Sequence, residues 1–233
     1  MNKLNCALLL SDHPHLADAA EAFARNCFDV RYVVRRSRWD NHVDGNMEAA
    51  FAEGFDCLLN FLCPVILPKH LLASVHGPAI NFHPAPPEWP GIGSPSLALY
   101  HEERVFGVTA HLMAEKVDAG DILKVMRFAI SERDSCENLF ARALDYTLIL
   151  FYEVAADVAA GRVPAPCGET WKRTALTRRQ FEKWMTVGVN DDPEEIRRKI
   201  RAVRHSKFPG PFIEHAGYRF ELPPGPPDVE ISK

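Results

Sequence analysis

Three side chains from two separate segments could together move a proton and stabilise a negative charge. Asn81 and His83 stand two residues apart at the end of an apolar run, "AINFHP", and Asp118 stands in "KVDAGDIL". An amide can donate to a developing oxyanion, and an imidazole titrates near neutral pH. A carboxylate could orient or charge that imidazole, or take a proton directly. Taken singly, a backbone-paired asparagine, a satisfied loop histidine and a turn aspartate account for each equally well.

The elements around these residues indicate how they could meet. Strand-like segments occupy 4–10, 28–35, 55–62, 78–83, 105–113 and 122–130, and helix-like segments occupy 15–26, 45–54, 94–103 and 134–160. This alternation predicts an α/β fold, with a Rossmann-like, mostly parallel sheet and helices on both faces. Ligands bind beyond the carboxyl ends of strands in such sheets, which is where Asn81 and His83 would lie. For the helix that follows, Ser94 is the expected N-cap and Pro95 its first residue.

The last part of the chain has a different character. It contains a linker at 161–173, a helix capped near Asp192, a hairpin that turns at Ala216-Gly217 and a frayed tail at 223–233. We therefore predict a catalytic domain over residues 1–165 and a C-terminal extension over 166–233, made of linker, helices, hairpin and tail.

The amino-acid composition limits the classes of protein to which the chain can belong. The chain has 233 residues, of which 47% are hydrophobic and 25% charged, with a net charge of -4. No overall basic field would hold a nucleic acid, and the late Arg and Lys runs fit a solvated helix face. No run is long enough to span a bilayer, and "LNCALLLS" is too short for a secretory signal. The six scattered cysteines indicate reduced thiols, so we expect a cytoplasmic protein with no membrane or nucleic-acid partner.

The sequence lacks the motifs of several common types of enzyme reaction. The first strand leads into "LLLSDHPHLAD", which has no glycine to cradle a dinucleotide pyrophosphate. There is no Gly-x-Ser-x-Gly elbow for a nucleophilic serine. His13 and His15 lack a clear third ligand, so we expect no metal site and regard them as polar loop residues lining a cleft.

The motif blocks together resemble the folate-dependent formyltransferases. That family carries Asn-x-His-Pro/Ala at a strand end, a Pro- and Gly-containing loop, and then Gly-x-Thr-x-His followed by Asp-x-Gly. Here the blocks are "NFHP", "APPEWPGIG", "GVTAH" and "VDAGDIL", in the family's order and spacing, and the resemblance covers at least residues 4–130. It implies that Asn81, His83 and Asp118 are catalytic and that 10-formyltetrahydrofolate is the donor. An amine would attack the formyl carbon, with Asn81 and His83 stabilising the oxyanion and Asp118 positioning His83.

The resemblance also implies where the substrates bind. "CPVILP" is similar to the segment whose backbone grips the pterin, and a second loop would complete that site. The implied folate contacts are Cys63, Val65, Ile66, Leu67, Glu115, Val117, Ala119 and Gly120. The implied acceptor contacts are His13, Gly91, His111 in a supporting role and Trp89 as a pocket wall.

The acceptor is a second question. The loop "HPAPPEWPG" is close to that of the sugar-nucleotide N-formyltransferases, so a nucleotide-linked amino sugar of the lipopolysaccharide O-antigen type is the expected acceptor. Arg35, Arg36 or Arg38 could meet its diphosphate, although we favour the interpretation that they are solvated surface arginines. Methionyl-tRNA and glycinamide ribonucleotide formyltransferases, a formyltetrahydrofolate hydrolase and a non-catalytic binding module stay open as alternatives. A homodimer is also left open.

Overall fold

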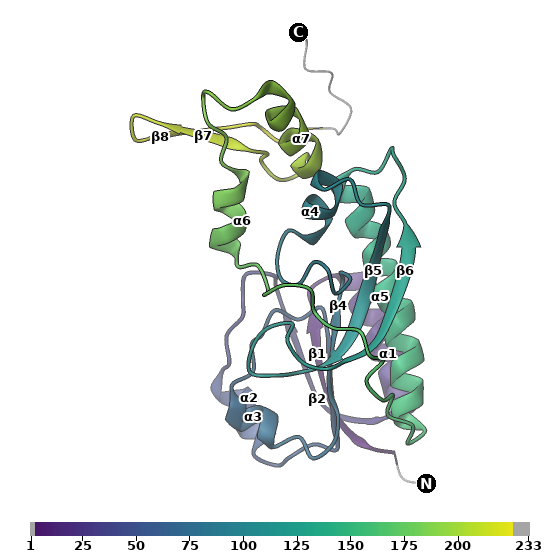
Figure 1. Ribbon diagram of the computed structural model, residues 1–233. Helices are drawn as coiled ribbons and strands as arrows, with labels where there is room; N and C mark the ends of the chain where they lie inside the picture. Colours follow the sequence, from purple (N-terminus) through teal and green to yellow (C-terminus); the bar gives the residue numbers. More distant parts are fainter. Residues whose placement is uncertain (1–2, 226–233) are drawn as a thin grey trace.

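A six-stranded sheet forms the centre of the protein (Figure 1). The computed structural model describes residues 3–225. The strands are β1 (Asn5–Ser11), β2 (Asp29–Arg36), β3 (Cys57–Phe61), β4 (Ala79–His83), β5 (Val105–Leu112) and β6 (Ile122–Ala129), in the order β2-β1-β3-β4-β5-β6. The first four pair in parallel, and β5 and β6 add antiparallel strands. The predicted mostly parallel α/β sheet is confirmed.

Helices cover both faces of the sheet, and each face has its own apolar core. Successive side chains of a strand point to opposite faces. Leu8 and Leu10 of β1 accordingly join one core cluster with α1 (Pro14–Cys27) and α5 (Cys136–Ala159). Ala7 and Leu9 join the other, with α2 (Gly45–Phe51) and α3 (Lys69–Ala73). Burial on both sides explains the continuous apolar runs of the parallel strands.

The short helix α4 (Ser94–Tyr100) begins differently from the prediction. Its N-cap is Gly93 in the left-handed region at φ 81°, so Ser94 is the first helical residue. The hydroxyl of Ser94 points back to the preceding loop, where the carbonyls of Trp89 and Gly91 are its acceptors, and α4 has no side-chain cap. The expected serine cap is therefore wrong, because the preceding loop recruits that hydroxyl.

The C-terminal part lies beyond the carboxyl ends of the parallel strands (Figure 1). It contains α6 (Arg178–Met185), α7 (Pro193–Val203) and the hairpin β7 (Phe212–His215) and β8 (Tyr218–Glu221). Asp192 caps α7 by accepting from the backbone of Glu194, as predicted. The hairpin turns at Ala216 and Gly217, both at positive φ, as two-residue hairpin loops require. Most of the predicted frayed tail, residues 226–233, lies outside the described residues.

Within residues 3–225, no helix combines the length and the apolar character needed to cross a membrane.

Candidate active site

The end of β4 presents Asn81 and His83 on one face of the sheet. Residues two apart in a strand share a face, and Phe82 between them points into the core. The antiparallel partner β5 places His111 directly opposite Asn81. The Asn81 Nδ2 and His111 Nε2 atoms lie 2.9 Å apart. Since His111 Nδ1 lies 2.8 Å from the Leu112 carbonyl and donates to it, His111 Nε2 can accept from the amide of Asn81.

Asp118 reaches the same point from the loop between β5 and β6. Its backbone adopts φ 45°, a left-handed conformation that turns the side chain back toward the sheet. Oδ2 accepts from the Gly91 amide at 2.8 Å and lies 3.4 Å from His83 Nδ1. Oδ1 lies 3.4 Å from His111 Nε2. One carboxylate thus contacts both histidines and the loop after β4.

Electrostatics fix the charge of this carboxylate. Burial alone would raise the pKa of Asp118, which is 7% exposed. At the low pH where Asp118 titrates, His83 is protonated, and its charge, the contact with His111 and the Gly91 amide outweigh burial and lower the pKa of Asp118 to about 2. Asp118 is therefore ionised at neutral pH, although it is almost fully buried.

His83 experiences opposing influences. Burial is the largest and lowers the pKa of its imidazole below the usual 6.5, while Asp118 opposes that shift. Its second nitrogen, Nε2, lies 3.4 Å from the Trp89 carbonyl, which also favours the protonated ring. The net lowering leaves His83 neutral at pH 7 and able to take up a proton, as a general base must be.

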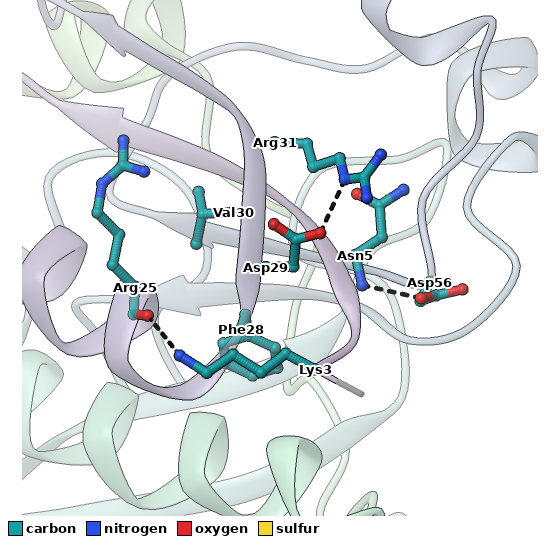
Figure 2. Close-up of a pocket in the computed structure, with 8 residues that line it drawn as sticks. All are labelled: Lys3, Asn5, Arg25, Phe28, Asp29, Val30, Arg31 and Asp56. Carbon is teal, nitrogen blue, oxygen red and sulfur yellow. Dashed lines mark hydrogen bonds and ion pairs between the residues drawn. The ribbon is translucent and has the colours of Figure 1, made fainter. Parts of the chain in front are cut away.

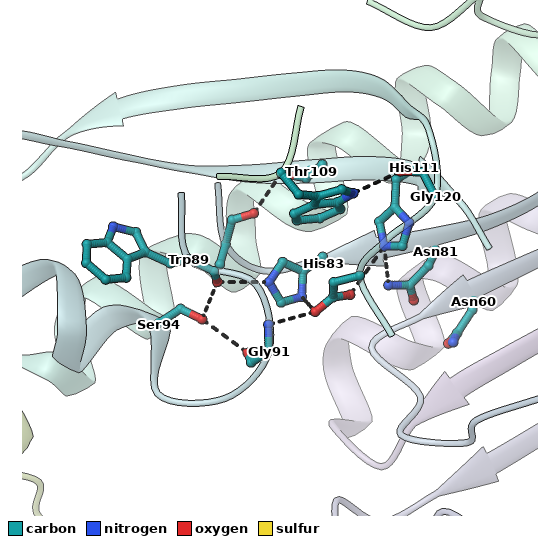
Figure 3. A network of polar contacts seen from close by, with 12 residues as sticks. Asn60, Asn81, His83, Trp89, Gly91, Ser94, Thr109, His111 and Gly120 are labelled. Atoms are coloured by element: carbon teal, nitrogen blue, oxygen red, sulfur yellow. Dashed lines mark hydrogen bonds and ion pairs between the residues drawn. The ribbon is translucent and has the colours of Figure 1, made fainter. Parts of the chain in front are cut away.

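The proline-rich loop after β4 is fixed in place around His83. Thr109 of β5 donates its hydroxyl to the Ala85 carbonyl at 2.8 Å, and Ser94 donates to the Trp89 carbonyl at 2.8 Å (Figure 3). Gly91 adopts φ 83°, and a Cβ there would lie 2.4 Å from backbone atoms of Leu176. Glycine is therefore required at position 91, where the loop contacts both Asp118 and a distant segment.

Trp89 does not occupy the place expected for it. Its indole is only 2% exposed and stacks on His101 with ring centroids 5.1 Å apart. The Arg173 guanidinium covers the ring at 3.9 Å. The predicted pocket wall is thus wrong for the side chain, because packing under α4 holds the indole in the core. Its carbonyl is the part that reaches the site.

The first loop implied for folate lies between β3 and α3. Asn60 at the end of β3 holds its start: its side-chain amide donates to the Cys63 carbonyl at 3.2 Å and accepts from the Cys63 amide at 3.0 Å. Cys63, Val65 and Leu67 are buried, whereas Ile66 is 50% exposed. The loop thus presents one apolar side chain beside polar backbone, which suits a flat heteroaromatic ring.

The second implied loop, Glu115 to Gly120, follows β5. Glu115 and Ala119 are exposed, and Val117 is an apolar side chain with 47% exposure. A Cβ at Gly120 would lie 1.9 Å from the Leu112 carbonyl, so only glycine allows this close approach. The carbonyl of Gly120 accepts from the indole N–H of Trp171 at 2.8 Å.

Trp171 is the main site residue that sequence reasoning missed. It lies in the predicted linker, and its ring makes edge contacts with His83 and His111 at centroid distances of 5.9 and 5.0 Å. A tryptophan inside a polar linker was the available signal. Asn60 gave no signal, since it reads as one residue of an apolar strand.

Two other features are separate from this network. His13, an expected acceptor contact, is exposed at the N-cap of α1 and makes no capping hydrogen bond. A cavity of about 760 Å³ lies at the amino ends of β1 and β2 (Figure 2). There Arg31 pairs with Asp29 at 2.8 Å and Lys3 donates to the Arg25 carbonyl, so its cations are engaged.

The part of the chain that the structure describes contains no group of three or more His, Cys, Asp or Glu side chains arranged to hold a metal ion.

Comparisons with known proteins bear on this site. Residues 3–155 match the model of the family described as formyl transferase. The methionyl-tRNA formyltransferase of Ehrlichia ruminantium (strain Welgevonden) is 28% identical over 159 residues, which are 68% of this chain and 50% of that relative. The chain spans about half the length of the curated relatives it matches.

Solved structures show the same fold. A sugar N-formyltransferase from Shewanella sp FDAARGOS_354 superposes with a TM-score of 0.76 at 19% identity, covering 98% of this chain and 99% of that chain. An N-formyltransferase from Helicobacter canadensis, in complex with folinic acid and dTDP-3-aminofucose, gives a TM-score of 0.62 at 17% identity, covering 87% and 80%. At these identities the likeness establishes the fold.

Proposed function

The chain belongs to the formyl transferase family, and we propose that it transfers a formyl group from 10-formyltetrahydrofolate to the amine of a nucleotide-linked amino sugar. The observation that carries the proposal is the convergence of Asn81, His83 and Asp118 at the end of β4, with the Asp118 carboxylate 3.4 Å from His83. We further propose residues 1–165 as the catalytic unit and 166–233 as its extension.

Asn81 supplies hydrogen-bond donors where negative charge develops. Its side-chain amide has two N–H groups, and His111 accepts only one of them at 2.9 Å. The other is free to donate to the formyl oxygen as the amine attacks. Because His111 fixes the amide in advance, the donor needs little reorganisation during the reaction, which is what makes such donors effective.

His83 and Asp118 handle the proton. The attacking amine must lose a proton once its bond to the formyl carbon forms, and the nitrogen that departs must gain one. Neutral His83 can accept that proton and pass it on, while ionised Asp118 stabilises the imidazolium. The net reaction forms one C–N bond and breaks another, with one proton relayed between the two nitrogens.

The two loops fit the formyl donor. Asn60 holds the backbone of Cys63 at the start of the first loop, and Ile66 and Val117 expose apolar side chains on the two loops. The donor supplies an activated formyl carbon, and these loops would hold its ring so that this carbon lies near His83.

The proposal of a sugar acceptor rests on two supports. The fold extends over nearly the whole of the Shewanella sugar N-formyltransferase, and the Helicobacter relative was solved with an amino-sugar nucleotide and a folate. The curated relatives with higher identity act on methionyl-tRNA, as their names state, which makes that acceptor the second candidate.

One assay series separates these functions. The purified protein and 10-formyltetrahydrofolate are offered dTDP-, UDP- and GDP-linked amino sugars, glycinamide ribonucleotide or charged initiator tRNA, and products are identified by mass spectrometry. We expect formylation of an amino sugar alone. Formylation only of the tRNA would refute the sugar acceptor, and formate release without any acceptor would indicate a hydrolase.

A further inference from the structure

Two arginines from distant parts of the chain lie against one exposed tryptophan. Arg38 and Trp39 follow β2, and Arg178 begins α6. The guanidinium carbons of Arg38 and Arg178 lie 4.7 and 4.3 Å from the centre of the Trp39 ring, which is 65% exposed. Arg38 also covers Phe208 at 4.7 Å. The rings therefore hold two like charges close together.

Neither guanidinium is bonded to a carboxylate of the described chain, in contrast to Arg35 and Arg36, which precede Arg38. Arg35 pairs with Asp18 and Glu21 at 2.7 and 2.8 Å. Arg36 pairs with Asp40 and Asp44. Residues 3–225 offer Arg38 and Arg178 only these aromatic rings. Of the three arginines considered for a diphosphate, Arg35 and Arg36 at the end of β2 and Arg38 after it, only Arg38 has no ion pair within residues 3–225.

The pair is electrostatically unfavourable without an anion. Burial and the charge of Arg178 both lower the pKa of Arg38, and Asp12 opposes them only through space. Arg178 stands in the first turn of α6, which has no acidic residue, so its charge also opposes the helix dipole. A guanidinium stacked on a ring keeps its N–H donors free at its edge, in the fork that matches phosphate oxygens.

The pair lies close to the proposed catalytic site. Gly91, whose amide binds Asp118, forms a parallel bridge with Leu176. The Leu176 amide donates to the Pro90 carbonyl, and its own carbonyl accepts from the Ile92 amide. Arg178 follows two residues later, about 7 Å of extended chain.

We propose that Arg38 and Arg178, held by Trp39, bind the diphosphate of a nucleoside-diphosphate acceptor, an inference that rests on the proposed function. Each guanidinium presents a fork of N–H donors, so the two guanidinium groups match the two linked phosphates of a diphosphate. Arg35 and Arg36, which precede Arg38, are already neutralised by ion pairs. Two guanidinium groups on one ring match a compact polyanion better than an RNA backbone, which needs a continuous basic surface.

The test measures nucleotide binding and turnover separately. Isothermal titration calorimetry with dTDP, UDP and GDP compares the wild-type protein with Arg38→Ala, Arg178→Ala and the double variant. The matched control is Arg219→Ala, which removes another arginine stacked on a ring, over Phe212 at 3.5 Å in the hairpin. A short RNA duplex that mimics a tRNA acceptor stem serves as the competing ligand.

We expect each single variant to weaken nucleoside-diphosphate binding by about tenfold to a hundredfold, as for other hydrogen bonds to charged groups. Arg219→Ala should bind as the wild type does. In turnover assays the two variants should raise KM for the acceptor with little change in kcat, the signature of lost uniform binding. KM for 10-formyltetrahydrofolate should not change.

Failure of this inference can be distinguished from failure of the proposed function. If the wild type formylates an amino-sugar nucleotide but the double variant keeps the same KM and nucleotide affinity, the arginine pair is refuted while the function stands. If the wild type binds none of the three nucleotides, or the pair is needed only for RNA binding, the diphosphate assignment is wrong. Formylation of a different amine by the wild type would refute the function itself.

Discussion

Replacing Asp118 by Asn tests the proposed proton relay most directly. The substitution keeps the size of the side chain and an oxygen that can accept from the Gly91 amide, which now donates at 2.8 Å. It removes the negative charge 3.4 Å from His83 Nδ1. Asp118→Asn therefore separates the charge of the carboxylate from its place in the loop.

The expected loss follows from that distance. At an effective dielectric constant of about 20, opposite unit charges at 3.4 Å attract by about 5 kcal/mol. Each 1.36 kcal/mol of transition-state stabilisation corresponds to a tenfold change in rate. An amide dipole recovers part of the interaction, so we expect kcat to fall by about a hundredfold to ten-thousandfold, the range typical of general acid–base groups.

Stability should change much less than the rate. The pKa of Asp118 is about 2 against a usual 3.8, so its surroundings favour the ionised form by roughly 2–3 kcal/mol. A depressed carboxylate pKa contributes stability above the unfolded value, and this contribution is lost as pH falls toward 2. Asp118→Asn should therefore lower the free energy of unfolding at pH 7 by at most that amount, and the variant should fold.

The assay measures single-turnover formyl transfer, with unfolding by urea followed in parallel. Asp121→Asn is the matched control, because Asp121 lies in the same stretch and is exposed. We expect the control to keep wild-type kcat. A folded Asp118→Asn variant with kcat within tenfold of the wild type would refute the role given to the carboxylate charge.

Three further outcomes are expected. Burial lowers the pKa of His83 below 6.5 in the free protein, so the acid limb of the kcat/KM–pH profile should fall below that value, and a limb at or above pH 7 would contradict a buried neutral base. Gly120→Ala should lower the free energy of unfolding by roughly 1–3 kcal/mol in a urea titration, since its Cβ would lie 1.9 Å from the Leu112 carbonyl. Trp171→Phe keeps a ring but loses the indole bond to Gly120, and should raise KM for the folate several-fold in steady-state assays; an unchanged KM would leave the indole without a part in holding that loop.

The sequence predicted the part of the site that depends on local pattern. Asn81 and His83 had to share a face, because they stand two residues apart in a strand. The family was predicted from four motif blocks in order, and the match over residues 3–155 confirms it. The catalytic roles of the trio stay predictions, since proximity establishes contact but not turnover.

Other parts depend on tertiary packing that no local pattern encodes. Trp89 stands in a loop beside the catalytic histidine, where an exposed wall was a reasonable expectation. Whether its ring faces the pocket or the core is decided by His101 and Arg173, which cover it from segments far away in the sequence. Ser94 had the right residue type for a cap, but its hydroxyl hydrogen-bonds to carbonyls of the loop before it and does not cap the helix.

The C-terminal segment belongs to the site more than its linker-like composition indicates. The backbone amide of Cys167 donates to the Ile122 carbonyl, and the indole N–H of Trp171 donates to the Gly120 carbonyl. Leu176 forms a β-bridge with Gly91. These contacts join the segment to two loops. One loop contains Asp118 itself, and the other contains Gly91, whose amide donates to the Asp118 carboxylate. A displacement of this segment would therefore move Asp118 and Arg178 together, so the proposed acceptor contact and the proposed proton relay share one structural support.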